Sequence, residues 1–273
     1  MPEMPEVETI ARNLRKAIIG KRVAGIRLSG LPLRRPVGKT LTARIEGRVV
    51  RKIHRRGKYL IAEMEPRAFW LIHLGMSGHL HYHPTDAQSS KHTHATVLFS
   101  DATRLEYCDS RRFGLLAAYE VAKISQIPEI GALGVEPLSP KLNPEWLARL
   151  LKESRRELKV FLLDQSKIAG LGNIYACEAL YGAGLHPSRR CFTLTRAEAG
   201  RLVAAVRRTL RAAIRNRGTS FSDYRDSNGR PGRHQKFLRI FQKEGEKCSR
   251  CGSLIMRLRQ GNRSTFYCPC CQK

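Results

Sequence analysis

Four cysteines near the C-terminal end of the chain have the spacing of a metal site. Cys248 and Cys251 form one Cys-x-x-Cys pair, Cys268 and Cys271 form a second, and sixteen residues separate the two pairs. Four thiolates at this spacing are typical of tetrahedral Zn²⁺ and leave no open coordination position. We therefore predict one structural zinc ion that supplies folding energy to a small β-hairpin unit. Cys270 could compete for the metal, although only Cys268 and Cys271 preserve the two-residue loop of the pair.

A second candidate for chemistry stands at the start of the chain, which opens MPEMPEVETI. Removal of Met1 would leave Pro2 with a secondary amine beside the carboxylate of Glu3. A terminal amine has a reference pKa of roughly 7.7 to 8.0 against about 10.4 for lysine, so much more of it is unprotonated at pH 7. Such an amine can attack a sugar C1′ and form an iminium, and a glutamate can supply the proton that opens the ring. Taken alone, the dipeptide is better explained as a plain helix start.

The charge of the chain is strongly positive and spread over its whole length. Lysine and arginine number 50 against 23 aspartates and glutamates, which gives a formal net charge of +27 over 273 residues. An excess of this size opposes compaction unless a polyanion neutralises it, so nucleic acid is the expected partner. The other four cysteines are scattered, which favours a reducing compartment. With no readable secretory signal and no stretch of membrane-spanning length, we expect a cytoplasmic protein.

Hydrophobic spacing predicts which elements position these residues in the first half of the chain. A helix is expected from Glu6 onward, with Gly20 where a C-terminal cap would lie. From residue 22 to about 120, β-type runs alternate with turn signals, as in a β-sandwich or barrel. The apolar row of the helix comprises Val7, Ile10, Ala11, Leu14 and Ile18. The clearest strand runs are RVAGIRL, GRVVRKIH, KYLIAEM, FWLIHLGM, ATVLFS and RLEYCD.

The second half of the chain is predicted to be helical. Asn143 before Pro144 is a good helix start, and Thr195 with Glu198 makes a capping box ahead of a long helix to about Asn216. Two further helices are expected over KVFLLDQ and NIYACEALYGAG, on either side of the tight turn AGLGN. The proline-rich stretch GVEPLSPKLNP is the natural linker. The predicted division is 1–133 (sandwich), 134–142 (linker), 143–237 (helices and a loop) and 238–273 (cysteine-rich unit).

Several motifs occur in order along the chain: MPEMPEVET, RRGKYL, IHLGMSGHL, DSRRFG, GVEPLSP, DQSKIAGLGNIYACEAL and the two cysteine pairs. Together they resemble the formamidopyrimidine-DNA glycosylases of the Fpg/Nei group. The resemblance implies an α+β multidomain fold with an N-terminal β-sandwich and its leading helix, a helix-two-turn-helix domain and a C-terminal zinc-finger β-hairpin. It implies a monomer that binds double-stranded DNA containing oxidised bases or abasic sites, in the bacterial cytoplasm and with the nucleoid.

The resemblance also implies a catalytic set. Pro2 matches the nucleophile of the family, Glu3 its acid, and Glu6 a second glutamate of the same segment. Lys58 in RRGKYL matches a lysine that contacts phosphate near the lesion. Arg263, which follows the glycine of the predicted hairpin tip, matches a phosphate-binding arginine of the same site.

A further group of residues corresponds to DNA contacts. His73 and Asn173 match residues that grip the phosphates beside the extruded nucleotide, and such contacts position a strand without reading bases. Met76, Arg111 and Phe113 match a trio that fills the void left when a base is flipped out of the duplex. The implied activity is excision of oxidised purines, 8-oxoguanine and formamidopyrimidines, followed by β,δ-elimination at the abasic site.

Some residues depart from the family pattern. Ser77 stands where other members have a glutamate, and Ser222, in the loop 218–237 that would close over the lesion, stands where some have a lysine or arginine. Phe241, Gln242 and Lys243 replace a common tyrosine, glycine and arginine. Two alternatives therefore stay open: a pyrimidine-directed, endonuclease VIII-like relative, and a zinc-containing DNA-binding protein without catalysis. The second leaves the Pro-Glu terminus and Lys58 unexplained.

Overall fold

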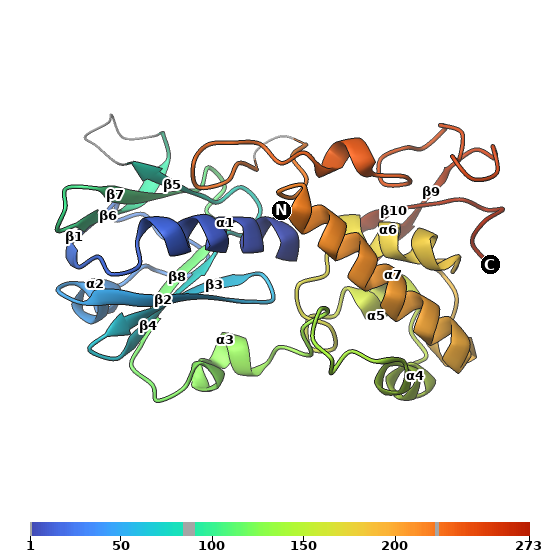
Figure 1. The fold of residues 1–273 in the computed structure, drawn as a ribbon, viewed down its shortest axis with the longest axis horizontal. Helices are drawn as coiled ribbons and strands as arrows, with labels where there is room; N and C mark the ends of the chain where they lie inside the picture. The colour runs from blue at the N-terminus through green and yellow to red at the C-terminus, as the bar shows by residue number, and fades with distance from the viewer. Residues whose placement is uncertain (1, 84–90, 222–223) are drawn as a thin grey trace. The chain divides into compact units, whose positions relative to one another are not determined.

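The computed structural model describes residues 2–83, 91–221 and 224–273 (Figure 1). Met1 and Ser222, on which two expectations depend, lie outside the described residues. The chain packs as two compact units. Unit 1 comprises Met1–Ala132 and Asn216–Arg233, and unit 2 comprises Leu133–Arg215 and His234–Lys273.

Unit 1 begins with helix α1, Met4–Ala17, as the apolar spacing predicted. Val7, Ile10 and Leu14 are buried because a period near 3.6 residues places them on one face. The helix starts at Met4, two residues before the expected position, and Glu3 is its N-cap. Gly20 lies beyond the end of the helix with a φ of 87°, where the chain turns toward the first strand.

Two four-stranded antiparallel sheets form the sandwich of unit 1. The first sheet has the order β1-β6-β7-β5 and the second has the order β2-β3-β4-β8. The strands are β1 Val23–Leu28, β2 Val49–Arg56, β3 Tyr59–Glu65, β4 Ala68–His73, β5 His79–His83, β6 Thr93–Phe99, β7 Arg104–Cys108 and β8 Leu115–Tyr119. The six strongest sequence runs all became strands. The strands β5 and β8 and the short helices α2 Lys39–Ile45 and α3 Pro128–Gly131 had not been predicted.

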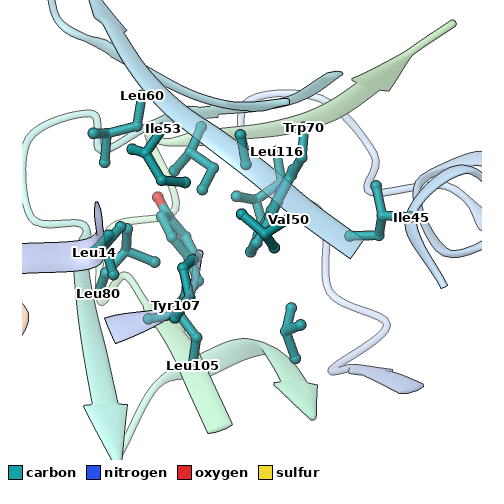
Figure 2. Close-up of a cluster of buried hydrophobic side chains, with 14 of the residues drawn as sticks. Leu14, Ile45, Val50, Ile53, Leu60, Trp70, Leu80, Leu105, Tyr107 and Leu116 are labelled. Atoms are coloured by element: carbon teal, nitrogen blue, oxygen red, sulfur yellow. The ribbon is translucent and has the colours of Figure 1, made fainter. Parts of the chain in front are cut away.

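The core of unit 1 lies between these sheets and the helix. Figure 2 shows Trp70 and Leu116 from one sheet, Leu80 and Tyr107 from the other, and Leu14 from α1 converging on a common interior. All five are at most 4% exposed. The strands are therefore held on a packed interior, and their connecting loops are left to carry other residues.

Unit 2 is helical, as predicted, up to its last segment. Its helices are α4 Pro144–Lys152, α5 Leu158–Leu162, α6 Asn173–Ala183 and α7 Arg196–Arg215. Both predicted caps are present: the Asn143 side chain accepts a hydrogen bond from Trp146 N at 2.8 Å, and Thr195 and Glu198 bond reciprocally. Short 3₁₀ turns lie at Cys191–Thr193 and His234–Phe237 in this unit, and at Ile124–Gln126 in unit 1.

The proline-rich stretch 134–142 is tied to unit 2 rather than hanging free. Gly134 N donates to Gln165 O at 2.9 Å, and the Arg207 guanidinium donates to Ser139 O and Leu142 O at 3.0 and 2.8 Å. Backbone polar groups of this stretch are thus hydrogen-bonded to the backbone of Gln165 and to the side chain of Arg207. The predicted domain division stays a prediction.

The cysteine-rich segment contains the predicted hairpin, strands β9 Met256–Gln260 and β10 Arg263–Tyr267. Two residues join them, Gly261 and Asn262, with φ angles of 50° and 60°. Positive φ at both central residues is the mark of a tight hairpin turn that matches the strand twist. Across the described parts of the chain, no helix combines the length and apolar character that a membrane span requires.

Candidate active site and metal centre

The start of the chain is buried and hydrogen-bonded. Pro2 is buried, Glu3 is 2% exposed and Glu6 is 1% exposed. Glu3 N donates to Glu6 Oε2 at 2.8 Å, and the Glu3 side chain accepts from the backbone of Glu6, which forms a capping box. This reciprocal pair fixes the direction of the chain before the helix begins. Pro2 directly precedes this fixed pair of glutamates.

Glu6 also ties the segment 216–233 to the start of the helix. Its Oε1 accepts from Thr219 N at 2.7 Å, and Tyr224 OH donates to the carbonyl of Glu6 at 3.3 Å. Burial and the neighbouring Glu6 raise the pKa of Tyr224, so this phenol stays protonated as a donor. Sequence reasoning assigned Glu6 only to the active-site segment, and the structure adds this second contact.

Lys58 and His73 lie at one end of the same strand pair. Tyr59 pairs with His73 across β3 and β4, with ring centroids 4.7 Å apart, and Lys58 directly precedes Tyr59. Burial, with Arg34 and Lys58 as nearby cations, lowers the pKa of His73 to about 4. The ring is neutral at pH 7. Because Nδ1 accepts from Gly75 N at 3.1 Å, the proton is on Nε2, which can donate to a phosphate oxygen.

Arg34 was not singled out from the sequence. It is exposed, and its backbone N donates to Gly114 O at 3.0 Å. Its positive charge contributes to the lowered pKa of His73. The pair of arginines in PLRRPV was the available signal, but basic pairs are common in a chain of this composition. Cations around a neutral donor make this end of the sandwich suited to a phosphodiester.

Two neighbouring loops present the predicted wedge residues. Met76 and Phe113 are each 43% exposed, so neither belongs to the core. The Arg111 guanidinium lies 4.8 Å from the centroid of the Phe113 ring. The loops are packed backbone to backbone: a Cβ on Gly75, whose φ is 61°, would lie 2.5 Å from the carbonyl carbon of Phe113. An exposed apolar side chain, an aromatic ring and a guanidinium therefore project from one rigid support.

Asp109 joins the two loops, and sequence reasoning missed it. The carboxylate is 0% exposed and accepts from Ser77 Oγ at 2.6 Å, Gly114 N at 2.8 Å and Arg111 N at 3.3 Å. Ser77, noted as a departure from the family pattern, is thus a structural contact between the loops. The position of Asp109 in DSRRFG was the only signal available.

In unit 2, Asn173 and Arg263 are brought together through the hairpin. Asn173 is the first residue of α6, and its Nδ2 donates to Ser264 O at 2.9 Å. Lys159, which is 0% exposed, donates to the same carbonyl at 3.2 Å and to Thr265 Oγ1 at 2.6 Å. Asn173 and Arg263 line one open hollow of about 600 Å³. Lys159 anchors the strand that carries Arg263, a role its sequence position did not reveal.

The four predicted cysteines form the metal centre. The Sγ atoms of Cys248, Cys251, Cys268 and Cys271 all lie within 4.8 Å of one another, with separations of 3.9 Å for one pair and 3.4 Å for another. A tetrahedron with Zn–S bonds of roughly 2.3 Å has an edge of about 3.8 Å, so the set fits one structural zinc ion. Cys270 is exposed and outside the group, which settles the choice of ligands.

The metal centre is joined to the helices by further contacts. Glu178 of α6, 7% exposed, accepts backbone N–H bonds from Arg239, Ile240 and Phe241 at 3.1, 2.9 and 3.0 Å. These three residues lead into the zinc hairpin. Tyr181, one turn further along α6, has its hydroxyl 3.2 Å from Cys248 Sγ. A single helix therefore orients both the entry to the hairpin and one metal ligand.

The structure places the predicted residues in two groups. Unit 1 holds Pro2, Glu3, Lys58, His73, Met76, Arg111 and Phe113, and unit 2 holds Asn173, Arg263, Cys248, Cys251, Cys268 and Cys271. Each group contains residues predicted to bind phosphate, together with a buried polar side chain that supports them: Asp109 in unit 1 and Lys159 in unit 2.

Comparisons with known families match the chain in three parts. The formamidopyrimidine-DNA glycosylase N-terminal domain matches residues 1–116, the formamidopyrimidine-DNA glycosylase H2TH domain matches residues 133–225, and a zinc finger found in FPG and IleRS matches residues 245–273. The last match contains all four clustered cysteines. The three expected parts of the fold, a sandwich, a helix-two-turn-helix region and a zinc hairpin, are confirmed.

Individual relatives cover the full length of the chain. The formamidopyrimidine-DNA glycosylase of Laribacter hongkongensis is 40% identical over 100% of both chains, and that of Desulforamulus reducens is 40% identical over 100% of this chain and 99% of its own. The Lactococcus lactis protein in complex with Fapy-dG containing DNA superposes with a TM-score of 0.92 at 33% identity and complete coverage of both chains. The Thermus thermophilus protein gives 0.89 at 38% identity, covering 99% of this chain and 98% of its own. On the three domain matches and these full-length relatives, the chain belongs to the formamidopyrimidine-DNA glycosylase family.

Proposed function

We propose that this protein is a bifunctional DNA glycosylase and abasic-site lyase of base excision repair, which excises 8-oxoguanine and formamidopyrimidines through a Schiff base on Pro2. The main observation in support of the proposal is that the first residues of the chain are buried and hydrogen-bonded. Chain termini are usually frayed, yet Glu3 and Glu6 are almost fully buried and bonded to each other. A segment held in this way suits a terminal amine that must meet a sugar carbon in a defined geometry.

The reaction follows from the groups in place. The Pro2 nitrogen attacks C1′ of the damaged nucleotide, and the base leaves with the electrons of the glycosidic bond and takes up a proton. Proton transfer from Glu3 to the ring oxygen opens the sugar and leaves an iminium between Pro2 and C1′. Loss of a proton from C2′ expels the 3′ phosphate, and loss of one from C4′ expels the 5′ phosphate. Hydrolysis then releases the sugar fragment and restores the amine.

The remaining residues position the DNA. Lys58, His73, Asn173 and Arg263 bind phosphates that flank the extruded nucleotide, which fixes the strand without reading its sequence. Met76, Arg111 and Phe113 enter the space left by the flipped base, where an exposed methionine and a phenyl ring replace lost stacking. The strongly basic composition supports the same partner, double-stranded DNA.

Borohydride trapping tests the proposal. The zinc-loaded protein without Met1 is mixed with a duplex that contains 8-oxoguanine opposite cytosine and reduced with borohydride. We expect a covalent adduct and strand cleavage, and Pro2→Gly or retention of Met1 suppresses both because the iminium needs the Pro2 amine. Arg12→Ala, at an α1 side chain that is 57% exposed, is the matched control and leaves trapping unchanged.

The same experiment separates the alternatives. A stronger adduct on oxidised thymine than on 8-oxoguanine favours a pyrimidine-directed enzyme. Tight DNA binding with no adduct on either an oxidised-purine or an abasic duplex leaves only a non-catalytic zinc protein. Location with the bacterial nucleoid, a monomeric state and the domain boundaries at 133, 142 and 237 are part of the same proposal.

A further inference from the structure

Gln242 occupies a backbone position that side chains rarely adopt. Its φ is 59°, in a turn closed by a hydrogen bond of 3.2 Å from Lys243 N to Ile240 O. In a turn of this kind the residue before the closing N–H takes a positive φ and is ordinarily a glycine, because a Cβ is disfavoured there. Backbone strain of this kind persists where the surroundings impose it, and it concentrates at functional sites.

The surroundings of the turn hold it firmly. The two residues before Gln242, Ile240 and Phe241, donate their backbone N–H groups to the buried carboxylate of Glu178. The Phe241 ring packs against Phe266 of β10 with centroids 5.2 Å apart. Gln242 is therefore the exposed tip of a turn that is anchored to both α6 and the zinc hairpin.

Gln242 lines the same hollow as Asn173 and Arg263. Within the described residues, its amide has no hydrogen-bond partner, and Arg263 has no acidic partner. The other charges of the hollow, Glu244 and Arg257, form an ion pair of 3.1 Å and offset each other. A single net positive charge and one unused amide thus share the hollow, which begins at the N-terminal end of α6.

This combination fits an anion with one charge and more than one acceptor oxygen, the description of a backbone phosphodiester. A guanidinium supplies the charge, and a neutral amide N–H₂ supplies a second donor without adding charge. We propose that Gln242 binds a phosphate oxygen of the DNA strand beside the phosphate contact of Arg263. The inference rests on the proposed function and adds a binding residue that departs from the family pattern.

Two substitutions separate the backbone effect from the amide effect. Gln242→Gly removes the strain and the amide, so we expect a melting temperature higher by about 2 to 4 °C and an affinity lower by about five- to tenfold. Gln242→Ala keeps the strain and removes the amide, so it gives the same loss of affinity without the gain in stability. Affinity is measured by fluorescence anisotropy on a duplex with a non-reactive abasic analogue.

Ala102→Gly is the matched control. Ala102 also has a positive φ, 65°, in an exposed turn of unit 1 between β6 and β7. Its replacement by glycine relieves the same kind of strain, so we expect a similar rise in melting temperature with no change in DNA affinity. A loss of affinity in this control would attribute the Gln242 result to backbone loosening and overturn the inference.

Salt dependence and phosphate replacement identify the contact. Arg263→Ala flattens the plot of log affinity against log salt by about 0.9, because one phosphate contact no longer releases a counterion. Loss of a neutral amide shifts the whole line and leaves its slope unchanged. In a second test, each phosphate of the duplex is replaced in turn by an uncharged methylphosphonate. At one position, the replacement should weaken binding of the wild type but cause no further loss in Gln242→Ala. If the losses from replacement and mutation are additive at every position, the proposal is contradicted.

Failure of this inference is distinguishable from failure of the proposed function. If wild type forms the borohydride adduct and Arg263→Ala weakens binding while both Gln242 variants bind like wild type, only the assignment of Gln242 is wrong. If wild type neither binds the abasic-analogue duplex nor forms an adduct, the proposed function itself fails.

Discussion

The two regions that carry the predicted DNA contacts are held in place by different means. In unit 1, the loops 74–78 and 109–114 join the two sheets of a sandwich with a large apolar core, and the buried carboxylate of Asp109 fixes them to each other. In unit 2, Arg263 stands on a two-stranded hairpin that depends on four metal ligands and on buried polar side chains such as Lys159. The hairpin buries only a small apolar cluster, which Ile255 and Phe266 form with Tyr181 of α6, so the metal ligands must add to that core.

The proposed phosphate donors of the two regions also differ in burial and charge. His73 lies in the wall of the sandwich, where burial keeps it neutral at pH 7, and Arg263 projects from the hairpin as a permanent charge. A buried neutral donor is fixed in geometry and contributes little to long-range attraction. An exposed guanidinium attracts a polyanion from a distance. Under the proposed function, we expect His73 of unit 1 to fix the position of the DNA strand and Arg263 of unit 2 to contribute more to its electrostatic attraction.

Zinc removal should have the largest effect on the hairpin of unit 2. Chelation, or Cys248→Ser, should unfold the hairpin, because binding of the metal is the folding energy of that unit. Loss of the Arg263 contact should weaken binding to lesion duplex by roughly 10- to 100-fold, in line with a hydrogen bond to a charged group. At saturating DNA the borohydride adduct should still form, because Pro2 lies in unit 1. Unchanged affinity in zinc-free protein would count against a hairpin that grips DNA.

Asp109→Ala tests what holds the loops 74–78 and 109–114 of unit 1 together. It leaves the Ser77 and Tyr107 hydroxyls and the Gly114 amide without their buried acceptor, which should destabilise unit 1 by roughly 3 kcal/mol. Urea unfolding measures the loss, and the zinc content of the variant should stay at one ion. Ser77→Ala removes one donor to Asp109 and one of the two acceptors of Arg111 N, and leaves the Gly114 contact of Asp109 intact, so it should cost about 1 kcal/mol. Equal losses in the two variants would show that Asp109 is not the joint between the loops.

Much of the fold was predictable because its signals are local. The helix α1, both caps in unit 2 and the six clearest strands each follow from residues within a few positions of one another. The strand β5 was missed because HLHYH offers only Leu80 and Tyr82 to the interior, and three histidines hide the alternation. The cysteine site was predictable for the same reason, since each Cys-x-x-Cys pair is a contiguous motif.

The supporting residues of the site were not predictable. Asp109, Lys159 and Glu178 look like ordinary surface charges in the sequence, and each acquires its role from its packing in the fold. Lys159 meets Thr265, 106 residues later, and Glu178 meets Ile240, 62 residues later. No periodicity marks a charge whose partner is supplied by tertiary packing. The proposed DNA-contact residues were identified through motifs, whereas the residues that support them became visible only in the fold.

Acidification should affect the sandwich through His73. Its pKa is about 4 in the folded protein against 6.5 for a free histidine. Between pH 4 and 6.5, His73 is therefore protonated in the unfolded chain but mostly neutral in the folded protein. Stability is complete above pH 6.5 and falls with decreasing pH, by about 2 kcal/mol at pH 5. The pKa of His81 is also lowered by burial and adds to the loss. His73→Gln should flatten the pH profile of unfolding; an unchanged profile would place the acid-sensitive group elsewhere.

The smallest loss of stability is expected for a substitution at Gly261, at the tip of the hairpin. Gly75, in a closely packed loop of unit 1, provides the comparison. Gly261 has a φ of 50°, and no atom lies within 4 Å of the position that a methyl group would take there, so Gly261→Ala meets only the backbone penalty, about 1 kcal/mol. Gly75 has a similar φ, but a methyl there would collide with the backbone of Phe113, and its replacement must also part the two loops. Thermal unfolding of Gly261→Ala and Gly75→Ala compares the sites directly. A penalty at Gly75 no larger than that at Gly261 would mean that backbone contact does not hold the wedge loops, and that the rigidity of unit 1 lies in the Asp109 hydrogen bonds alone.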